Sequence, residues 1–412
     1  MDFSLVDQVI TPRVGAQANA TLTAIPSDLE VKEAVFDMDS DSSPGPDGFN
    51  GIFYRHFWDV ISAEVTADVR FFFSNSSLPL GLNASFMELI PKTKDANVIE
   101  NFRPIVMSNF IFKIITKILA TRLGLIVSDY LSPMQFGFIP GRQIHDCIAM
   151  VSEGFNVLQG RTDANMIVKT DIRKAFDTLS WDFLLYVLCH FGFSETFVRW
   201  VEVVLRSSRI YVLLNGTPVG YFPCFKGVRQ GDPLSPLLFC IAEEVLGRLI
   251  EVAMDRAEEV LGRPRGIVFP SSILYADDIV IMSGASSANA RILLQILTLY
   301  ADISGQAFNP RKSKVYFGSR VSNHVRGRVQ SIMGIHLGAF PMTYLGAPIF
   351  KGVPKAAVLQ PVFDKVILKF RIWKGTSLSL ARRVCLVNSV ITSSLVHTMM
   401  VYKWPRSLLS KW

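Results

Sequence analysis

Two adjacent aspartates, Asp277 and Asp278, stand between two short apolar segments, residues 273–276 and 279–282. Short apolar runs of this kind are typical of strands, so we expect the pair at the turn of a hairpin. Two neighbouring carboxylates in a buried turn are costly unless a cation neutralises them. A divalent metal ion is the natural partner, although a solvated turn, in which aspartate is common, explains the same segment.

A third aspartate, Asp171, follows a predicted apolar strand over residues 166–170. If this strand pairs beside the hairpin, Asp171 and Asp277 face one another and can bridge two Mg²⁺ ions roughly 3.5–4 Å apart, with Asp278 completing the cluster. Carboxylate oxygens suit Mg²⁺, and Mn²⁺ is an alternative. Such a site transfers phosphoryl or nucleotidyl groups, because one metal activates a 3′-hydroxyl while the other holds the triphosphate.

Other polar residues near these segments have both a functional and a structural interpretation. The loop over residues 227–236 contains glycine and precedes a helix, so its amides, Arg229 and Gln230 are candidates for contacting a nucleotide or template phosphate. The same loop is equally compatible with a plain helix entry. We interpret Asp177 as a turn residue and Asp182 as a carboxylate favoured in the first turn of a helix.

The elements that position these residues follow from local patterns. Ser27 is a predicted N-cap of a helix after Pro26, and helical spacing recurs over residues 51–74 and 109–130. Further predicted elements are a helix over 181–191, a hairpin over 209–222 with Asn215-Gly216 at its turn, a helix over 235–256, a helix over 288–303 and a strand over 314–317. This order predicts an α+β fold with a small sheet covered by helices.

The charge distribution favours a polyanionic partner. The 412 residues include 42 Lys and Arg against 35 Asp and Glu, a net charge of +7, and this excess is concentrated in residues 311–328 and 351–383. A merely solvated surface is the alternative, but phosphate backbones are the partner that such a basic region serves best.

The cysteines and the N-terminus exclude other classes of protein. Five scattered cysteines without a Cys-x-x-Cys spacing predict neither a zinc site nor a disulfide framework. Asp2 and Asp7 stand where a signal peptide would be basic, and no uncharged apolar run reaches about 18 residues, so we expect neither secretion nor a membrane partner. A 50% hydrophobic content therefore indicates a folded core.

An ordered set of motifs resembles the reverse transcriptase of non-LTR (LINE-type) retrotransposons, especially plant ones. The motifs are Ser-Pro-Gly-Pro-Asp-Gly-Phe (43–49), Leu-Ile-Pro-Lys (89–92), Asn-Phe-Arg-Pro-Ile (101–105), Gln-Phe-Gly-Phe-Ile-Pro-Gly-Arg (135–142), Lys-Thr-Asp-Ile-Arg-Lys-Ala-Phe-Asp (169–177), Arg-Gln-Gly-Asp-Pro-Leu-Ser-Pro (229–236), Tyr-Ala-Asp-Asp (275–278), Ser-Gly-Gln-Ala-Phe-Asn-Pro-Arg-Lys-Ser (304–313) and Tyr-Leu-Gly-Ala-Pro (344–348). The resemblance covers nearly the whole chain from about Pro26, and an ordered set is far more specific than any one motif.

This resemblance implies a right-hand polymerase that copies an RNA template into DNA from a DNA primer, using dNTPs. The implied parts are an N-terminal extension (1–30), fingers (31–163), a ferredoxin-like palm (164–350, with residues around 225–236 contributing to the fingers) and a partial helical thumb (351–412). A nuclear location with a cytoplasmic ribonucleoprotein stage is also implied, and the oligomeric state is left open.

The resemblance also implies roles for individual residues. Asp171, Asp277 and Asp278 match the metal ligands, and Phe176 matches the residue that excludes a 2′-hydroxyl, with a core aromatic as its alternative. The residues that match nucleotide-binding positions are Lys92, Arg103, Gln230 and Lys312, with Lys314 competing for the last role. The residues that match primer or template contacts are Arg229, Tyr344, Leu345 and Gly346.

Departures from the family pattern leave other functions open. Arg382 replaces an expected glycine in the thumb segment 378–388, and Tyr275 stands where phenylalanine is usual. We expect the chain to be a fragment without the endonuclease and zinc-knuckle regions. The alternatives are an inactive nucleic-acid-binding remnant of a retroelement and a protein resembling a group II intron maturase.

Overall fold

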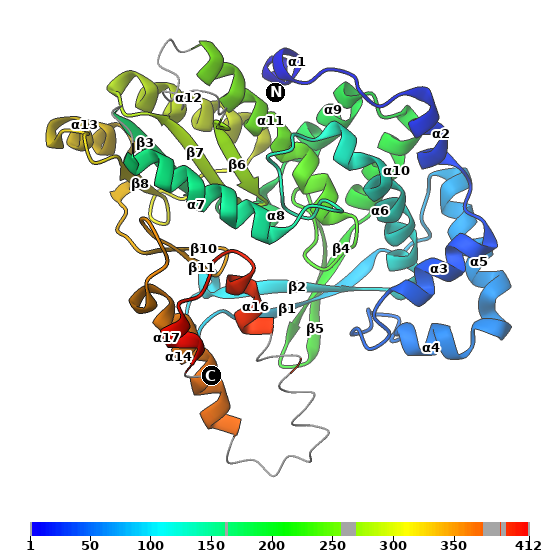
Figure 1. The fold of residues 1–412 in the computed structure, drawn as a ribbon. Coiled ribbons are helices and arrows are strands. Elements are labelled where there is room, and N and C mark those ends of the chain that lie inside the picture. The colour runs from blue at the N-terminus through cyan, green and yellow to red at the C-terminus, as the bar shows by residue number, and fades with distance from the viewer. Residues whose placement is uncertain (1, 161–163, 257–268, 374–387, 389–392, 411–412) are drawn as a thin grey trace. The chain divides into compact units, whose positions relative to one another are not determined.

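The computed structural model describes residues 2–160, 164–256, 269–373, 388 and 393–410 (Figure 1). These residues form two compact units. Unit 1 comprises the described residues within 1–140, 172–252 and 295–308, and unit 2 comprises those within 141–171, 253–294 and 309–412. The predicted thumb segment 378–388, with Arg382, lies outside the described residues except for Asn388.

Unit 1 contains a four-stranded sheet in the order β2-β1-β4-β5. Its strands are β1 (Ala84–Pro91), β2 (Phe102–Ser108), β4 (Arg209–Leu214) and β5 (Thr217–Pro223). Its helices are α1 (Ser4–Val9), α2 (Ala16–Thr23), α3 (Asp28–Asp37), α4 (Gly51–His56), α5 (Trp58–Asn75), α6 (Phe110–Tyr130), α8 (Ala175–Thr178), α9 (Trp181–Phe191), α10 (Glu195–Arg206) and most of α11 (Ser235–Arg256), with a 3₁₀ turn at Ile99–Asn101.

Helices α3, α6, α9 and α11 of unit 1 form where the sequence predicts them. Ser27 caps α3 by accepting a hydrogen bond from the Glu30 amide, and Val31 is fully buried. The predicted helix over 51–74 is divided at Phe57 into α4 and α5. The weakly patterned residues 1–30 nevertheless form α1 and α2, because Val6 and Leu22 are fully buried against the rest of the unit.

The predicted hairpin over 209–222 is present, but it belongs to the unit 1 sheet and not to the sheet that contains the strand before Asp171. It forms β4 and β5, with Asn215 and Gly216 both at positive φ in the turn. Strand β4 then pairs in parallel with β1, more than a hundred residues earlier in the chain. Local periodicity cannot reveal such a distant partner, so the expectation of one small sheet was wrong.

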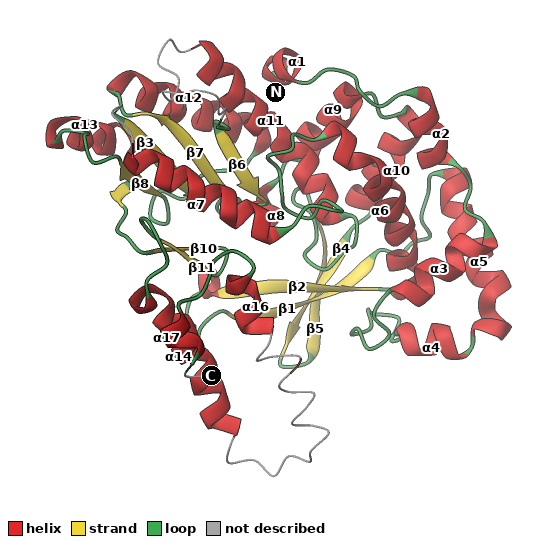
Figure 2. Cartoon of the chain, viewed as in Figure 1, coloured by secondary structure: helices red, strands yellow, loops and turns green. Residues whose placement is uncertain are grey.

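Unit 2 contains a five-stranded sheet in the order β6-β7-β3-β8-β9. Figure 2 labels β6, β7, β3 and β8 of this sheet. Its strands are β3 (Asn165–Asp171), β6 (Ser272–Tyr275), β7 (Asp278–Gly284), β8 (Lys314–Phe317) and β9 (His336–Leu337). A separate hairpin consists of β10 (Met342–Tyr344) and β11 (Ala347–Ile349), and the helices are α7 (Ile144–Gly160), α13 (Asn323–Met333), α14 (Ala356–Trp373), α16 (Ser393–Met399) and α17 (Arg406–Leu409). Helix α12 (Ser287–Ser304) begins in unit 2 and ends in unit 1.

The centre of the unit 2 sheet is apolar on both faces. Residues 166–168 of β3 and 279–282 of β7 are almost fully buried. Helix α7 contacts β3 and β6 and contributes the buried Val151 and Phe155. A buried, well-packed sheet is a rigid support for side chains at its ends.

The description of the fold as mixed α+β is confirmed. Helix α7, which the predicted boundaries place in the fingers, lies in unit 2 with the β3 sheet. The division into fingers, palm and thumb stays a prediction. Among the described residues, no helix combines the length and apolar character needed to cross a membrane.

Candidate active site

Asp171 and Asp278 lie directly opposite each other at one end of the unit 2 sheet. Asp171 is the last residue of β3 and Asp278 the first of β7, and they are partners in the antiparallel register. Opposite residues in such a pair project from the same face with Cβ atoms roughly 4.5–5.5 Å apart, and like charges there are destabilising. The sheet thus holds two carboxylates together at an electrostatic cost.

Asp277 occupies the two-residue turn between β6 and β7. Tyr275 and Asp278 form the last pair of the hairpin, and Ala276 adopts φ +50°, the left-handed conformation that such a turn requires. Burial, followed by the charges of Asp278 and Asp171, raises the pKa of Asp277 to about 6. The three aspartates therefore form one electrostatically coupled cluster, which we call the aspartate cluster.

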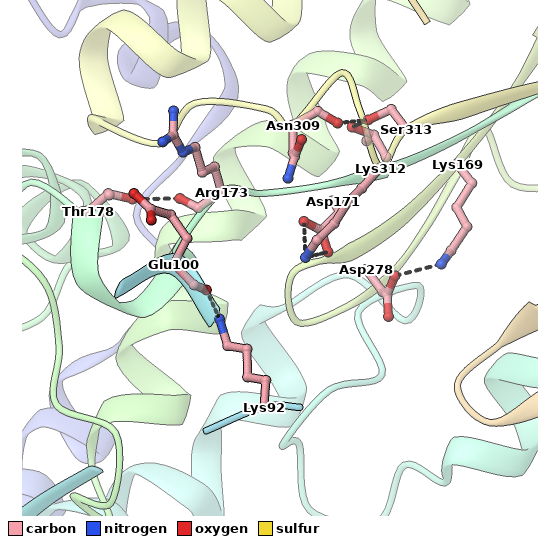
Figure 3. A network of polar contacts seen from close by, with 11 residues as sticks. Lys92, Glu100, Lys169, Asp171, Arg173, Thr178, Asp278, Asn309, Lys312 and Ser313 are labelled. Carbon is pink, nitrogen blue, oxygen red and sulfur yellow. Dashed lines mark hydrogen bonds and ion pairs between the residues drawn. The ribbon is translucent and has the colours of Figure 1, made fainter. Parts of the chain in front are cut away.

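Lys312 contacts this cluster from a turn that docks on the end of β3. Its Nζ lies 3.2 Å from Asp171 Oδ1 and 3.4 Å from Oδ2 (Figure 3). The amide of Asn309 donates to the carbonyl of Asp171 at 3.0 Å, and the Lys312 amide donates back to Asn309 O at 3.2 Å. The hydroxyls of Thr170 and Ser313 are 2.9 Å apart and join the same turn to the strand. These bonds fix the backbone turn from which the Lys312 side chain extends.

Lys169 supplies a second cation. It precedes Asp171 by two residues in β3, so both side chains are on the same face, and its Nζ lies 3.0 Å from Asp278 Oδ1 (Figure 3). The same ammonium group lies 5.5 Å from the ring centre of Tyr344. Asp171 and Asp278 each have a lysine partner, whereas burial and the two neighbouring carboxylates destabilise the charged form of Asp277.

Tyr344, Leu345 and Gly346 form a tight hairpin turn, as a supporting turn at the primer end would require. Leu345 has φ +45° and Gly346 φ +84°, and Tyr344 pairs with Ala347. The Tyr344 side chain is fully buried, its hydroxyl lies 3.4 Å from Cys147 Sγ, and burial raises its pKa. Its contact with Lys169 connects this turn to Asp278. Primer binding by the turn stays a prediction.

The chemistry of the aspartate cluster suits a hard divalent cation. Its donors are carboxylate oxygens, and the high free energy of three adjacent negative charges would fall when a metal ion binds. Among the described residues, no group of three His, Cys, Asp or Glu side chains already converges closely enough to hold a metal ion. A metal ion would have to share or take over the carboxylate oxygens that Lys312 and Lys169 contact. Mg²⁺ binding stays a prediction.

Phe176 is fixed by aromatic packing within unit 1. Its ring stacks on Phe239 with centres 4.9 Å apart and an interplanar angle of 12°, and Phe138 meets it edge-on at 6.3 Å. The side chain is only half-buried, so part of the ring remains accessible. This geometry is compatible both with the predicted contact to a nucleotide sugar and with a packing role.

Arg229 is used inside unit 1. Its guanidinium donates to the hydroxyls of Ser85 and Ser108 at 3.3 Å each and to Val204 O at 3.2 Å, and it lies 4.5 Å from the ring centre of Phe112. The loop that contains it is therefore anchored beneath the sheet. A template contact by Arg229 stays a prediction, and the guanidinium would have to exchange these internal hydrogen bonds to make it.

Gln230, Lys92 and Arg103 lie on neighbouring parts of unit 1. The Gln230 carbonyl accepts a hydrogen bond of 3.2 Å from the Val106 amide of β2, which holds the loop against the sheet. Lys92 and Arg103 are exposed on the β1–β2 hairpin, and Lys92 Nζ donates to Glu100 O at 2.9 Å. Alternation along the strands places both lysine and arginine on one face of the sheet. Their binding to a triphosphate stays a prediction.

The expected position of Asp182 in the first turn of a helix is confirmed, whereas Asp177, expected in a turn, lies in a helix. Asp182 lies in the first turn of α9 and forms an ion pair of 2.8 Å with Arg206. Asp177 lies in α8, and burial raises its pKa. The cysteines that the structure describes, Cys147, Cys189, Cys224 and Cys240, are present as thiols.

The sequence reasoning missed the residues that support the cluster. Lys169 was recognisable in retrospect, because alternation puts it on the face of Asp171. Asn309 and Ser313 belong to the motif over residues 304–313, but nothing in their spacing predicts that they dock on the end of β3. Their role depends on tertiary contacts between residues more than a hundred positions apart.

Comparison with known proteins places this geometry in a family. A model of the reverse transcriptase (RNA-dependent DNA polymerase) family matches residues 90–349, more than half of the chain. A 149 kDa protein of transposon TX1 from Xenopus laevis is 24% identical over 394 residues, 93% of this chain and 29% of that protein. The Pol polyprotein of the retrotransposable element R2DM from Drosophila melanogaster is 29% identical over 256 residues, 62% of this chain and 23% of that protein.

A more distant similarity concerns an intron-encoded protein. The putative COX1/OXI3 intron 1 protein of Saccharomyces cerevisiae is 27% identical over 162 residues, 39% of this chain and 18% of that protein. This chain spans less than a third of the length of each of these relatives. A special relationship to plant elements stays a prediction. The matched residues include Asp171, Asp277 and Asp278. The chain belongs to the reverse transcriptase family, with relatives among non-LTR retrotransposon proteins.

Proposed function

We propose that this chain is an RNA-directed DNA polymerase that adds dNTPs to the 3′-hydroxyl of a DNA primer on an RNA template. One observation carries this proposal: β3 and the β6–β7 hairpin bring Asp171, Asp277 and Asp278 to one end of a buried sheet in a chain of this family. Asp171, Asp277 and Asp278 would hold Mg²⁺, which lowers the pKa of the attacking hydroxyl and neutralises the triphosphate.

The remaining residues of the site orient the substrates and control charge. Lys312 neutralises Asp171 before substrate binds, and its flexible, largely exposed ammonium group can turn to the leaving pyrophosphate. Lys169 holds Asp278 in a fixed orientation. Phe176 would lie under the incoming sugar and reject a 2′-hydroxyl, while Lys92 and Arg103 would bind the triphosphate.

Primer extension tests this function. Purified protein should extend a DNA primer annealed to RNA when Mg²⁺ is present, and chelation with EDTA should stop it. Asp277→Asn should lower the rate at least ~100-fold, because it removes a charge that the reaction uses. Asp302→Asn, the same change at an exposed position of α12, is the matched control and should extend at the normal rate. Normal extension by Asp277→Asn would contradict the proposal.

A binding-only function is the second candidate, and one observation favours it. Lys312 and Lys169 already pair with two of the three carboxylates, which gives the cluster a stable arrangement without a metal ion. Such a protein would bind RNA with a steep salt dependence but incorporate no nucleotide with either Mg²⁺ or Mn²⁺. The same extension assay therefore separates the two functions.

A further inference from the structure

A row of aromatic rings crosses the sheet of unit 1. Phe86 on β1, Tyr211 on β4 and Tyr221 on β5 lie on three adjacent strands. The ring centres of Phe86 and Tyr211 are 6.0 Å apart, and those of Tyr211 and Tyr221 are 4.7 Å apart with an interplanar angle of 28°. We call these three residues the aromatic row.

A backbone irregularity places the last ring in the row. The register of β4 and β5 shifts between Ile210 and Val212, so Gly220 and Tyr221 together lie opposite Tyr211. Gly220 has φ +76°, a conformation that glycine adopts without strain, and a Cβ there would lie 3.2 Å from the Phe222 ring. The bulge thus turns Tyr221 onto Tyr211 at the edge of the sheet.

The row ends in solvent. Strand β5 is the edge of its sheet, and its residues 217–222 are all exposed. Tyr221 is 44% exposed and Phe225, just after the strand, is 80% exposed. An exposed stack of rings is unusual in a strand that does not bind a partner, because apolar edges promote aggregation.

The charges around the row favour a polyanion. Alternation along β1 places Phe86 on the same face as Lys92, and the register places Arg103 on that face opposite Ile90. Within the four strands, the acidic residue Glu88 also lies on the face of Phe86, and the basic residues are Arg103 and Arg209. The β4–β5 hairpin is followed by the exposed Lys226. Aromatic rings with cations beside them on an open sheet match the chemistry of unpaired bases joined by phosphates.

We propose that the aromatic row binds a single-stranded nucleic acid, with an unpaired base stacking on Tyr221 and extending the row beyond the sheet edge. Lys226, just after β5, contacts the phosphate next to this base. This site is distinct from the aspartate cluster and does not depend on catalysis, so it would bind a strand in a chain that polymerises and in one that does not.

Fluorescence anisotropy with a short labelled oligouridylate tests the proposal, using the full chain in EDTA without dNTPs so that polymerisation plays no part. Tyr221→Ala should weaken binding by roughly 5- to 150-fold, the range for loss of one base stack. Tyr221→Phe should bind normally, whereas Tyr221→Leu, which retains bulk but not the ring, should bind as weakly as the alanine variant. Phe71→Ala, at a similarly exposed aromatic on α5, is the control and should bind normally.

Two further probes separate stacking from charge. An oligonucleotide of equal length and charge without bases should bind the wild type and Tyr221→Ala equally. Lys226→Ala should reduce the salt dependence of oligouridylate binding by about one phosphate contact, and Tyr221→Ala should leave it unchanged. Equal binding of oligouridylate by Tyr221→Ala and wild type, or a difference that persists on the strand without bases, would overturn the proposal. If β5 instead pairs two copies of the chain, light scattering should show a dimer for the wild type and a lower mass for Tyr221→Ala, which would also overturn the proposal.

Discussion

At the residue scale, the aspartate cluster is held in an arrangement that the charges themselves oppose. Asp171 and Asp278 are register partners, and Asp277 sits in the turn beside them with its pKa raised to about 6. Lys312 and Lys169 offset part of this repulsion. A site that needs neutralising cations in its resting state is prepared to exchange them for other cations, since the backbone keeps the carboxylates together regardless.

The two lysines near β8 are expected to differ in importance. Lys312→Met should lower the rate constant for extension by roughly 100- to 1,000-fold, because it removes the cation placed at Asp171 and expected at the leaving pyrophosphate. Lys314→Met removes an equal charge from the start of β8, opposite Lys169, and should cost much less. Single-turnover extension kinetics measure both. A larger loss with Lys314→Met would assign the role to Lys314.

At the element scale, the loop before α11 is locked to the turn that contains Phe176. The Gly227 amide donates to Leu179 O at 2.7 Å, the Val228 amide to Phe176 O at 2.6 Å, and the Trp181 indole to Gly227 O at 2.6 Å. Gly227 has φ +81°, and a Cβ would lie 2.7 Å from Asp177 O. Glycine is required there for two reasons, backbone conformation and space.

Two glycine variants separate these reasons. Gly227→Ala should destabilise the protein by about 2–5 kcal/mol, the sum of left-handed strain and the clash with backbone. Gly48→Ala has nearly the same φ, +79°, but nothing lies within 4 Å of the added Cβ, so strain alone should cost about 1–2 kcal/mol. Urea denaturation followed by tryptophan fluorescence measures both. Equal losses in the free energy of unfolding would show that the close approach to Asp177 does not contribute to the requirement for glycine.

Elements with a strong local signal were predictable from the sequence, and their partners were not. The Ser27 cap, the Asn215-Gly216 turn and the strands on either side of Asp277 each depend on neighbours within a few residues. The pairing of the Asp171 strand beside the Asp277 hairpin was expected only as a condition, and the register confirms it, although the residue opposite Asp171 is Asp278 and not Asp277. The parallel pairing of β1 with β4 and the docking of Asn309 on Asp171 depend on contacts across long sequence separations, which periodicity does not encode.

At the scale of the whole molecule, residues 2–30 belong to unit 1, and a buried arginine joins the segment from the end of α2 to the start of α3 to that unit. Arg122 of α6 donates to both carboxylate oxygens of Glu30, at 2.7 and 2.8 Å, and to the carbonyls of Leu22 and Ala24. Its side chain is 6% exposed. One guanidinium therefore satisfies acceptors from the end of α2, from the following turn and from α3.

Loss of this guanidinium should loosen the N-terminal helices. Arg122→Met should destabilise unit 1 by about 3–5 kcal/mol, because it leaves Glu30 and two carbonyls without their donor. Arg70→Met breaks the more exposed ion pair with Asp28 and the hydrogen bond of 2.8 Å from Arg70 Nε to Pro26 O, and is the matched control, expected to cost about 1–2 kcal/mol. Thermal denaturation measures stability, and limited proteolysis within residues 10–25 reports local opening, since cleavage requires the segment to detach. If Arg122→Met loses no more stability than Arg70→Met and is cleaved no faster, packing of Val6, Val9 and Leu22 alone must hold this segment in place.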